Sequence, residues 1–389
     1  MSGLKTFVEA DLPEGWRESK VGEHFAFKNG LNKSKHFFGY GTPIINYMDV
    51  YRHPWLLPSQ VSGKVSVTRT ERRAYSAEQH DAFFTRTSEI VAEIGMCSVL
   101  MGPIESAVFS GFVLRARPLS DLLSPGFAAY MLRGRKVREQ IEASATYTTR
   151  ALTNGRSLSS VNFLLPPLHE QQRITSVLRD VDELIASLDA LIAKKRDIKQ
   201  AAMQQLLTGK TRLPGFSREW QQSALGDVLR VRHGRDQKAI QCDDGRYPIL
   251  ATGGEIGRTN TPLYTRPSVL IGRKGTIDRP QFMDQPFWTV DTLFYTEIQG
   301  LNSPLYLFYV FQTIDWRSYN EASGVPSLST KTIEAIPIKL PEPDEQVEIA
   351  TNLADYDREI DGLEKRSAKF LALREGMMQQ LLTGRIRLV

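Results

Sequence analysis

The chain has 389 residues, of which 41% are hydrophobic and 24% charged, a composition that is ordinary for a globular protein and excludes a disordered one. The length allows two or three domains, each with its own core. The sequence has no apolar run of about 18 residues and no apolar signal core near its start, so it predicts a cytoplasmic protein without a membrane span.

The charge distribution indicates a polyanionic partner. The formal net charge is +5 and the isoelectric point is near 9.0. The positive excess lies in residues 1–168, whereas the segment from residue 341 onward is acidic. Cys97 and Cys242 are too few for a disulfide framework, and the histidines lack metal-ligand spacing, so no structural zinc is expected.

Residues 1–165 and 213–340 predict two globular domains of mixed α and β structure. Both ranges alternate short β-rich runs with Gly, Pro and Asp turns and then continue into a helical stretch. They also share landmarks, which are Trp16 over Trp220, Gly22 over Gly226 and Gly30 over Gly234. Most residues between the landmarks differ. We therefore expect an α+β fold in which two domains share one framework and carry different surfaces.

Each predicted domain is followed by one copy of a long repeat, at residues 166–212 and 341–389. The phrase MQQLLTGKTRL, which begins at Met203, returns as MQQLLTGRIRL at Met378. Apolar residues recur in both copies at steps of three and four, which predicts two long helices with one apolar stripe each. Prolines precede both helices, and Gly209 and Gly384 stand where a glycine ends a helix.

A long helix with a narrow apolar stripe needs a partner, and the other copy is the nearest one. We expect the two helices to pair antiparallel as an intramolecular coiled coil with pseudo-twofold symmetry. The alternative is that each helix packs only on its own domain. The coiled-coil residues expected from the stripe are Ile174, Leu178, Val181, Ile185, Leu188, Ile192, Ile349, Leu353, Tyr356, Ile360, Leu363 and Phe370. The stripe is expected to continue through Ile198 and Leu206 and through Leu373 and Leu381.

The sequence lacks the motifs of several enzyme classes. It has no glycine-rich cofactor loop with G-x-G spacing, no phosphate-binding Walker loop and no polar-Pro-Pro-aromatic turn for a flipped base. The carboxylates of Asp355, Asp357, Glu359 and Asp361 are dense, but on a helix they predict a solvated acidic face and not a metal site. We therefore expect no catalytic residue and no metal ligand in this chain.

Basic clusters with short amides are the candidate nucleic-acid contacts. Arg and Lys fit phosphates and guanine edges, and Asn fits adenine edges. The expected DNA-binding residues of the first domain are Lys28, Asn29, Asn32, Lys33, Lys35, Arg69, Arg72, Arg73 and Arg150. Those of the second domain are Arg230, Arg232, His233, Arg235, Lys238, Arg273 and Lys274. For any single member the plainer interpretation is a solvated surface charge.

Two helix leaders make the chain resemble the specificity subunit of a type I restriction-modification enzyme. They are LPPLHEQQ from Leu165 and LPEPDEQ from Leu340, each followed by QQLLTG, and an LPEGW segment begins at Leu12. The resemblance implies two target recognition domains, each reading one half of an asymmetric bipartite site in double-stranded DNA. It also implies recruitment of two methyltransferase subunits and, through them, of restriction subunits. S-adenosylmethionine, ATP and Mg are then expected on the partners, and no cofactor on this chain.

Two other functions stay open from the sequence. The chain could be a DNA methyltransferase or nuclease by itself. It could also be a coiled-coil adaptor that binds proteins and has no sequence-specific DNA binding. Methyl transfer by the purified chain alone would identify the first, and weak, sequence-blind DNA binding would identify the second.

Overall fold

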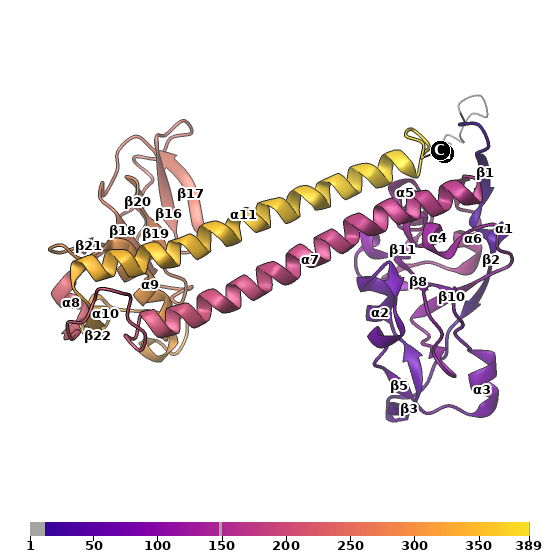
Figure 1. The fold of residues 1–389 in the computed structure, drawn as a ribbon, viewed down its shortest axis with the longest axis horizontal. Coiled ribbons are helices and arrows are strands. Elements are labelled where there is room, and N and C mark those ends of the chain that lie inside the picture. The colour runs from indigo at the N-terminus through magenta and orange to yellow at the C-terminus, as the bar shows by residue number, and fades with distance from the viewer. Residues whose placement is uncertain (1–11, 148–149, 389) are drawn as a thin grey trace. The chain divides into compact units, whose positions relative to one another are not determined.

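The computed structural model describes residues 12–147 and 150–388, and contacts within the chain divide it into two units. Unit 1 comprises residues 1–187 and 367–389, and unit 2 comprises residues 188–366. Each unit therefore joins one globular domain to parts of both long helices (Figure 1). None of the helices in the described ranges combines the length and hydropathy that a membrane span requires.

The globular part of unit 1 mixes short strands and short helices. The strands are β1 (Arg17–Lys20), β2 (Phe25–Asn29), β3 (Phe38–Ile45), β4 (Trp55–Leu56), β5 (Lys64–Val65), β6 (Ala82–Thr85), β7 (Thr87–Ser88), β8 (Cys97–Leu100), β9 (Val108–Phe109), β10 (Val113–Pro118), β11 (Thr146–Tyr147), β12 (Ala151–Leu152) and β13 (Asn162–Leu165). The α-helices are α1 (Val21–His24), α2 (Tyr47–Arg52), α3 (Arg69–Ala74), α4 (Pro125–Met131), α5 (Arg135–Ala143) and α6 (Gly155–Ser159). The 3-10 helices are η2 (Lys35–Phe37), η3 (Pro58–Gln60) and η4 (Val91–Glu93).

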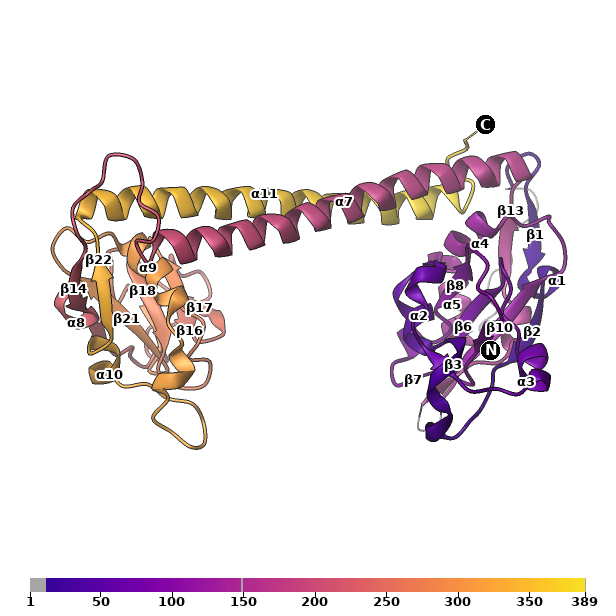
Figure 2. The same cartoon turned by 60° about the horizontal axis from the view of Figure 1, so that its bottom comes forward.

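A five-stranded sheet in the order β2-β10-β6-β8-β4 forms the centre of unit 1 (Figure 2). Strand β10 pairs antiparallel with both β2 and β6, and β4 pairs parallel with β8. Smaller sheets have the orders β11-β12-β7, β5-β3-β9 and β1-β13. The main core lies between the sheet and helix α4, where Phe84, Phe127 and Tyr130 are fully buried.

The globular part of unit 2 is smaller. Its strands are β14 (Gln221–Ala224), β15 (Leu229–Arg232), β16 (Tyr247–Ala251), β17 (Gly254–Thr259), β18 (Ser268–Gly272), β19 (Gln281–Met283), β20 (Trp288–Thr289), β21 (Leu293–Ile298) and β22 (Pro337–Leu340). Its helices are α8 (Leu225–Val228), α9 (Pro304–Thr313), η5 (Trp316–Tyr319) and α10 (Thr330–Glu334). The sheet orders are β15-β21-β18-β19, β17-β16-β20 and β14-β22.

In both units, the same two features lie beside the start of the long helix: a pair of strands and a short helix with a serine N-cap. A first strand pairs antiparallel with the last strand before the helix, β1 with β13 in unit 1 and β14 with β22 in unit 2. A helix that precedes this last strand packs against the long helix and has a serine N-cap, which is Ser124 for α4 and Ser303 for α9. In both caps the serine side chain accepts a backbone hydrogen bond, which satisfies one of the free amides at the helix start.

The two long helices are α7 (Leu168–Leu206) and α11 (Pro343–Leu381), each of 39 residues. At 1.5 Å per residue this length corresponds to roughly 58 Å. Gly209 and Gly384 both have a φ of +69°, the left-handed conformation that ends a helix, as the sequence predicts. In each unit the segments of α7 and α11 lie side by side and antiparallel, because contacts advance along one helix as they recede along the other.

The apolar stripe is used in two ways. Ile185, Leu188, Ile192 and Ile360 are buried on the helices themselves, as a coiled coil requires. Nearer the helix ends, the stripe joins the globular cores instead. Ile174, Leu178, Met378 and Leu381 belong to the core of unit 1, and Met203, Leu206, Ile349 and Leu353 belong to the core of unit 2. Val181, Tyr356, Leu363 and Phe370 are half-buried.

The expected continuation of the stripe through Ile198 and Leu373 is wrong. Their side chains are 38% and 50% exposed. Ile198 lies six residues after Ile192, a step that rotates a 3.6-residue helix well away from the buried face. The half-buried positions there are taken by charged residues, Lys199 on α7 and Arg374 on α11.

The acidic run on α11 is also more than a solvated face. Asp355 and Asp361 pair with exposed cations of their own helix, whereas Glu359 pairs with Lys195 of α7. Asp357 is half-buried and binds Lys199. Asp355, Glu359 and Asp361 are exposed, as a solvated face requires, and Asp357 is the one carboxylate of these four that is half-buried. Within the described ranges, no group of three or more His, Cys, Asp or Glu residues has an arrangement that could hold a metal ion.

Candidate nucleic-acid interface and helix docking sites

In unit 1, two of the predicted basic clusters lie together. Lys28 and Asn29 end strand β2, and the loop that follows carries Lys33. Lys33 forms an ion pair of 2.9 Å with Glu71 of α3 and donates a hydrogen bond to the Ser66 carbonyl. The ammonium of Lys28 lies 5.7 Å from the ring centroid of Tyr75, just after α3. These contacts fix the loop after β2 against the helix that carries the second cluster.

Most cations of this surface are not neutralised. Asn29, Asn32 and Lys35 are exposed. Arg69, Arg72 and Arg73 on α3 are exposed as well, and no carboxylate of the described residues pairs with them. The surface therefore presents uncompensated positive charge beside short amides, which suits phosphate and base-edge contacts.

Arg150 lies elsewhere in unit 1. Its guanidinium is 3.4 Å from the carboxylate of Glu89, and both side chains are more than half exposed. The two residues line a cavity together with Tyr47 and Phe112, and Phe112 is 61% exposed. No contact joins Arg150 to α3 or to the loop after β2 among the described residues.

In unit 2, the first predicted cluster begins on strand β15. Arg230 and Arg232 occupy alternate positions there and point to the exposed face, while Leu229 and Val231 point inward. Arg232 pairs with Glu297 of the neighbouring strand at 2.9 Å, and this hydrogen bond raises its pKa. The ring of His233 packs edge-on against the ring of Phe294.

A single loop brings the two clusters of unit 2 together. Gly234 lies so close to this loop that an added Cβ would stand 2.1 Å from the Val290 carbonyl oxygen. The backbone amides of Arg273 and Lys274 donate to the Thr292 carbonyl of the same loop. In unit 1, a Cβ added to Gly30 would likewise lie 2.0 Å from the Ser110 carbonyl oxygen. The matched glycines therefore mark equivalent backbone crossings beside both candidate surfaces.

The cations around this loop divide into paired and free ones. Arg273 pairs with Asp291 at 2.6 Å, whereas Arg235, Lys238 and Lys274 are exposed and have no carboxylate partner among the described residues. Each unit thus combines fixed cations, which shape the surface, with free cations, which can meet a polyanion.

The start of each long helix is held by a buried carboxylate. In unit 1, Glu170 is fully buried and accepts two hydrogen bonds from Arg387, at 2.8 and 2.9 Å, and one from the Trp16 indole at 2.9 Å. We call Trp16, Glu170 and Arg387 the unit 1 clamp. Burial acts to raise the pKa of Glu170, but the hydrogen bonds from Arg387 and Trp16 outweigh it and lower that pKa below its usual 4.5.

The unit 2 clamp consists of Trp220, Glu345 and Arg212. Arg212 donates to Glu345 at 2.6 and 2.8 Å, and the Trp220 indole donates to the same carboxylate at 3.2 Å. In both clamps the arginine comes from the tail of one long helix and the glutamate from the start of the other. The repeated phrase therefore has a structural role, because the arginine near its end binds the end of each long helix to the start of the other.

A second polar contact follows along each helix. The Tyr130 hydroxyl donates to Asp182 at 2.8 Å, and Arg374 binds the other carboxylate oxygen. In unit 2 the Tyr309 hydroxyl donates to Asp357 at 2.7 Å, and Lys199 binds that carboxylate at 2.5 Å. Burial and the hydrogen bond to the carboxylate raise the pKa of both tyrosines.

Buried glutamines complete the docking. Gln171 accepts from the Ser124 amide at 2.8 Å and donates to the Pro166 carbonyl at 3.0 Å. Gln346 makes the matching contacts with Ser303 and Pro341 at 2.9 and 3.1 Å. Sequence reasoning aligned these glutamines as a repeat and missed their role. The signal that could have revealed this role is the recurrence of the same polar residue in both copies, because a buried polar side chain needs hydrogen-bond partners.

Comparisons with known proteins agree with this architecture. Residues 217–370 match the family described as type I restriction modification DNA specificity domain. The putative type I restriction enzyme MjaX specificity subunit of Methanocaldococcus jannaschii is 22% identical over 97% of this chain and 95% of its own length. The MjaVIII specificity subunit of the same organism is 22% identical over 66% of this chain and 70% of its own length.

Over nearly its whole length the chain is similar to type I restriction-modification specificity subunits. Solved structures support the same fold. The type I restriction-modification S subunit of M. genitalium has a TM-score of 0.62 at 16% identity and covers 94% of this chain and 96% of its own. The HsdS subunit of Thermoanaerobacter tengcongensis has a TM-score of 0.51 at 17% identity and covers 96% of this chain and 98% of its own. The mixed fold and the resemblance predicted from the sequence are therefore confirmed.

Proposed function

We propose that this specificity subunit reads an asymmetric bipartite site in double-stranded DNA, one half with each globular domain. The observation that carries the proposal is that both units repeat one framework and bear different side chains at the equivalent surface. Unit 1 offers Asn29, Asn32 and the arginines of α3, whereas unit 2 offers Arg235, Lys238 and Lys274. Different donors and acceptors at equivalent places favour different half-sites.

In this proposal, the free cations contribute affinity for DNA and the side-chain amides contribute selection between bases. Exposed Arg and Lys side chains without carboxylate partners bind phosphates and release counterions. Asn29 and Asn32 have the amide geometry that pairs with adenine edges. Five other predicted residues already have contacts within the chain: Arg150, Arg230, Arg232, His233 and Arg273. We propose that they shape the surface, or that they contact DNA only after giving up their present partner.

The helix pair suits recruitment of two copies of one partner. Because α7 and α11 repeat the same clamp and the same tyrosine contact, each unit presents an equivalent helical surface. Equivalent surfaces favour two identical methyltransferase subunits, with restriction subunits joining through them. In this proposal the chain itself is not catalytic, and S-adenosylmethionine, ATP and Mg act on the partner subunits. Helix length would set the number of unread base pairs between the half-sites.

A pair of matched alanine variants tests the reading function. One variant replaces Arg235, Lys238 and Lys274, and the other replaces Arg69, Arg72 and Arg73. We expect each to weaken binding of the selected duplex about tenfold or more near physiological salt, because each removes up to three phosphate contacts. The measurement is the selection of binding sites from random duplexes by the chain assembled with its methyltransferase subunits. The unit 2 variant should lose base preference at one half-site, and the unit 1 variant should lose it at the other half-site.

The control variant removes three ion-paired cations that lie outside the long helices and outside the predicted DNA-binding residues: Arg218, Arg258 and Arg317. It should retain both base preferences. Equal loss at both halves in either surface variant would contradict the assignment of one half to each unit. Weak and sequence-blind binding by the unmodified assembly would instead identify a protein-binding adaptor.

A further inference from the structure

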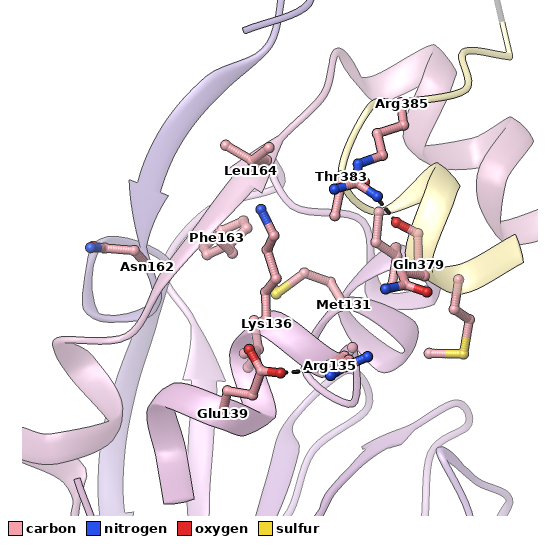
Figure 3. A pocket seen from close by; sticks show the side chains of 14 residues that line it. Met131, Arg135, Lys136, Glu139, Asn162, Phe163, Leu164, Gln379, Thr383 and Arg385 are labelled. Carbon is pink, nitrogen blue, oxygen red and sulfur yellow. Dashed lines mark hydrogen bonds and ion pairs between the residues drawn. The ribbon is translucent and has the colours of Figure 1, made fainter. Parts of the chain in front are cut away.

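A cavity of about 260 Å³ lies in unit 1, between the end of α11 and the globular domain. Its walls come from the start of α5, from strand β13 and from the last turn of α11 with the residues that follow (Figure 3). The apolar part of the wall consists of Met131, Val137, Phe163, Leu164, Met378 and Leu382. The volume is slightly below the usual range of small-ligand pockets, roughly 300 Å³ and more, so it suits a body of about one ring.

The polar part of the cavity wall is cationic. Arg135, Lys136 and Arg385 contribute three positive charges, and Glu139 contributes one carboxylate. That carboxylate is bound by Arg135 at 2.8 Å. In the view of Figure 3, the side chain of Lys136 extends toward the part of the cavity where Phe163 and Thr383 also lie. A ligand in this cavity would therefore meet net positive charge beside an aromatic ring.

Lys136 and Arg385 are close enough to disturb each other. Partial burial lowers the pKa of Lys136, and the neighbouring charge of Arg385 lowers it further. The nearby carboxylate of Glu139 acts in the opposite direction, and a bound anion would further screen the two like charges. Gly134, the N-cap of α5, also lines the cavity and makes no side-chain cap.

We infer that this cavity binds a small organic anion, an aromatic or similarly flat apolar body that carries one carboxylate or phosphate group. The body would lie against Phe163 and Met378, and the acidic group would lie between Lys136 and Arg385. Because the cavity joins α5 to the end of α11, an occupied site would hold that helix end more firmly on its domain. The inference does not depend on the proposed DNA recognition.

Sequence repeats supply matched controls for this site. Arg385 corresponds to Lys210, and Gln379 corresponds to Gln204, in the other copy of the repeated phrase. Where unit 1 has helix α5 after α4, unit 2 has the short 3-10 helix η5 after α9. A substitution in the α7 copy therefore changes the same motif without changing this cavity.

The test uses fluorine NMR titration of the full-length chain with para-trifluoromethylbenzoate and with the neutral para-trifluoromethylbenzamide. We expect saturable one-to-one binding of the benzoate and a weaker affinity for the benzamide. The combined variant Lys136→Gln and Arg385→Gln should weaken benzoate binding by about tenfold and leave the benzamide nearly unchanged. Gln379→Trp, at an exposed position on the cavity rim, should weaken both probes.

The control variants Lys210→Gln and Gln204→Trp should bind both probes as the unmodified chain does. The trifluoromethylphenyl phosphate analogue tells a carboxylate site from a phosphate site by its relative affinity. The inference is overturned if benzoate and benzamide bind equally, if binding does not saturate, or if the combined variant binds as well as the unmodified chain. Thermal unfolding of each variant confirms that it is folded, and duplex binding measured in parallel reports on the separate DNA function.

Discussion

The two clamps contain the same three residue types, yet they differ in tightness. In unit 1, Trp16 is buried and its indole lies 2.9 Å from Glu170. In unit 2, Trp220 is half-buried and the matching distance to Glu345 is 3.2 Å. Both carboxylates are almost fully buried, and both arginines remain about one quarter exposed. The difference indicates that the repeat preserves the ion pair, while the surrounding domain decides how much water reaches it.

This comparison explains why the globular domains can differ while the helices remain alike. The contacts that fasten a domain to the helices use few residues, and these are the repeated ones. The candidate DNA surfaces lie on other elements, namely the loop after β2 with α3 in unit 1, and β15 with the loops near Gly234 and Arg273 in unit 2. The docking contacts and the candidate DNA contacts are therefore made by different residues, and one set can change without the other.

The largest effect is expected from removing the clamp charge. Glu170→Gln leaves a buried amide opposite Arg387 and should lower the free energy of unfolding of unit 1 by about 3 kcal/mol. Glu345→Gln should cost unit 2 less, about 2 kcal/mol, because its indole contact is longer and wetter. Hydrogen exchange of peptides from each unit measures the two losses separately.

Glu348→Gln is the control for this pair, because Glu348 is exposed on the first turns of α11. It should change the exchange of either unit little. A larger loss from Glu345→Gln than from Glu170→Gln would reverse the order of the clamps, and no loss from either would remove the docking role of the buried carboxylates.

Sequence reasoning predicted the local features and missed those that join distant residues. The two long helices, their glycine ends and the mixed fold followed from periodicity and turn residues. The expectation that Ile198 and Leu373 continue the stripe was wrong, because these positions depart from the three- and four-residue steps that keep a side chain on one face of a helix. The clamps could not be predicted, since Trp16 and Glu170 are separated by 154 positions, and their meeting depends on the strand pairing of β1 with β13. The DNA-binding residues stay a prediction.

A pH titration sharpens the comparison for unit 1. The folded pKa of Glu170 lies below 4.5, so its stabilisation is complete above pH 4.5 and is lost as the pH falls through the folded pKa. The difference in unfolding free energy between the unmodified chain and Glu170→Gln should stay constant from neutral pH down to about 5 and shrink below 4.5. Urea unfolding followed by tryptophan fluorescence measures it. A difference independent of pH would show that packing, and not charge, holds this helix start.

The smallest effect concerns the cation beside each tyrosine–aspartate contact, which is Arg374 in unit 1 and Lys199 in unit 2. The Arg374 guanidinium carbon lies 6.0 Å from the ring centroid of Tyr130, and the Lys199 ammonium lies 5.3 Å from that of Tyr309. Arg374→Lys should cost unit 1 about 0.5 to 1 kcal/mol, because lysine loses the planar guanidinium that faces both ring and carboxylate.

The reciprocal change Lys199→Arg should leave the stability of unit 2 within about 0.5 kcal/mol, because Asp357 is bound by one ammonium and tolerates a larger cation at a half-exposed carboxylate. Double-mutant cycles with Asp182→Asn and Asp357→Asn, read by the exchange of each unit, separate the ion pair from the ring contact. Equal costs for the two swaps would mean that the units hold their helices by charge alone. Unequal costs in the expected direction would show that the cation in unit 1 is chosen for its shape as well.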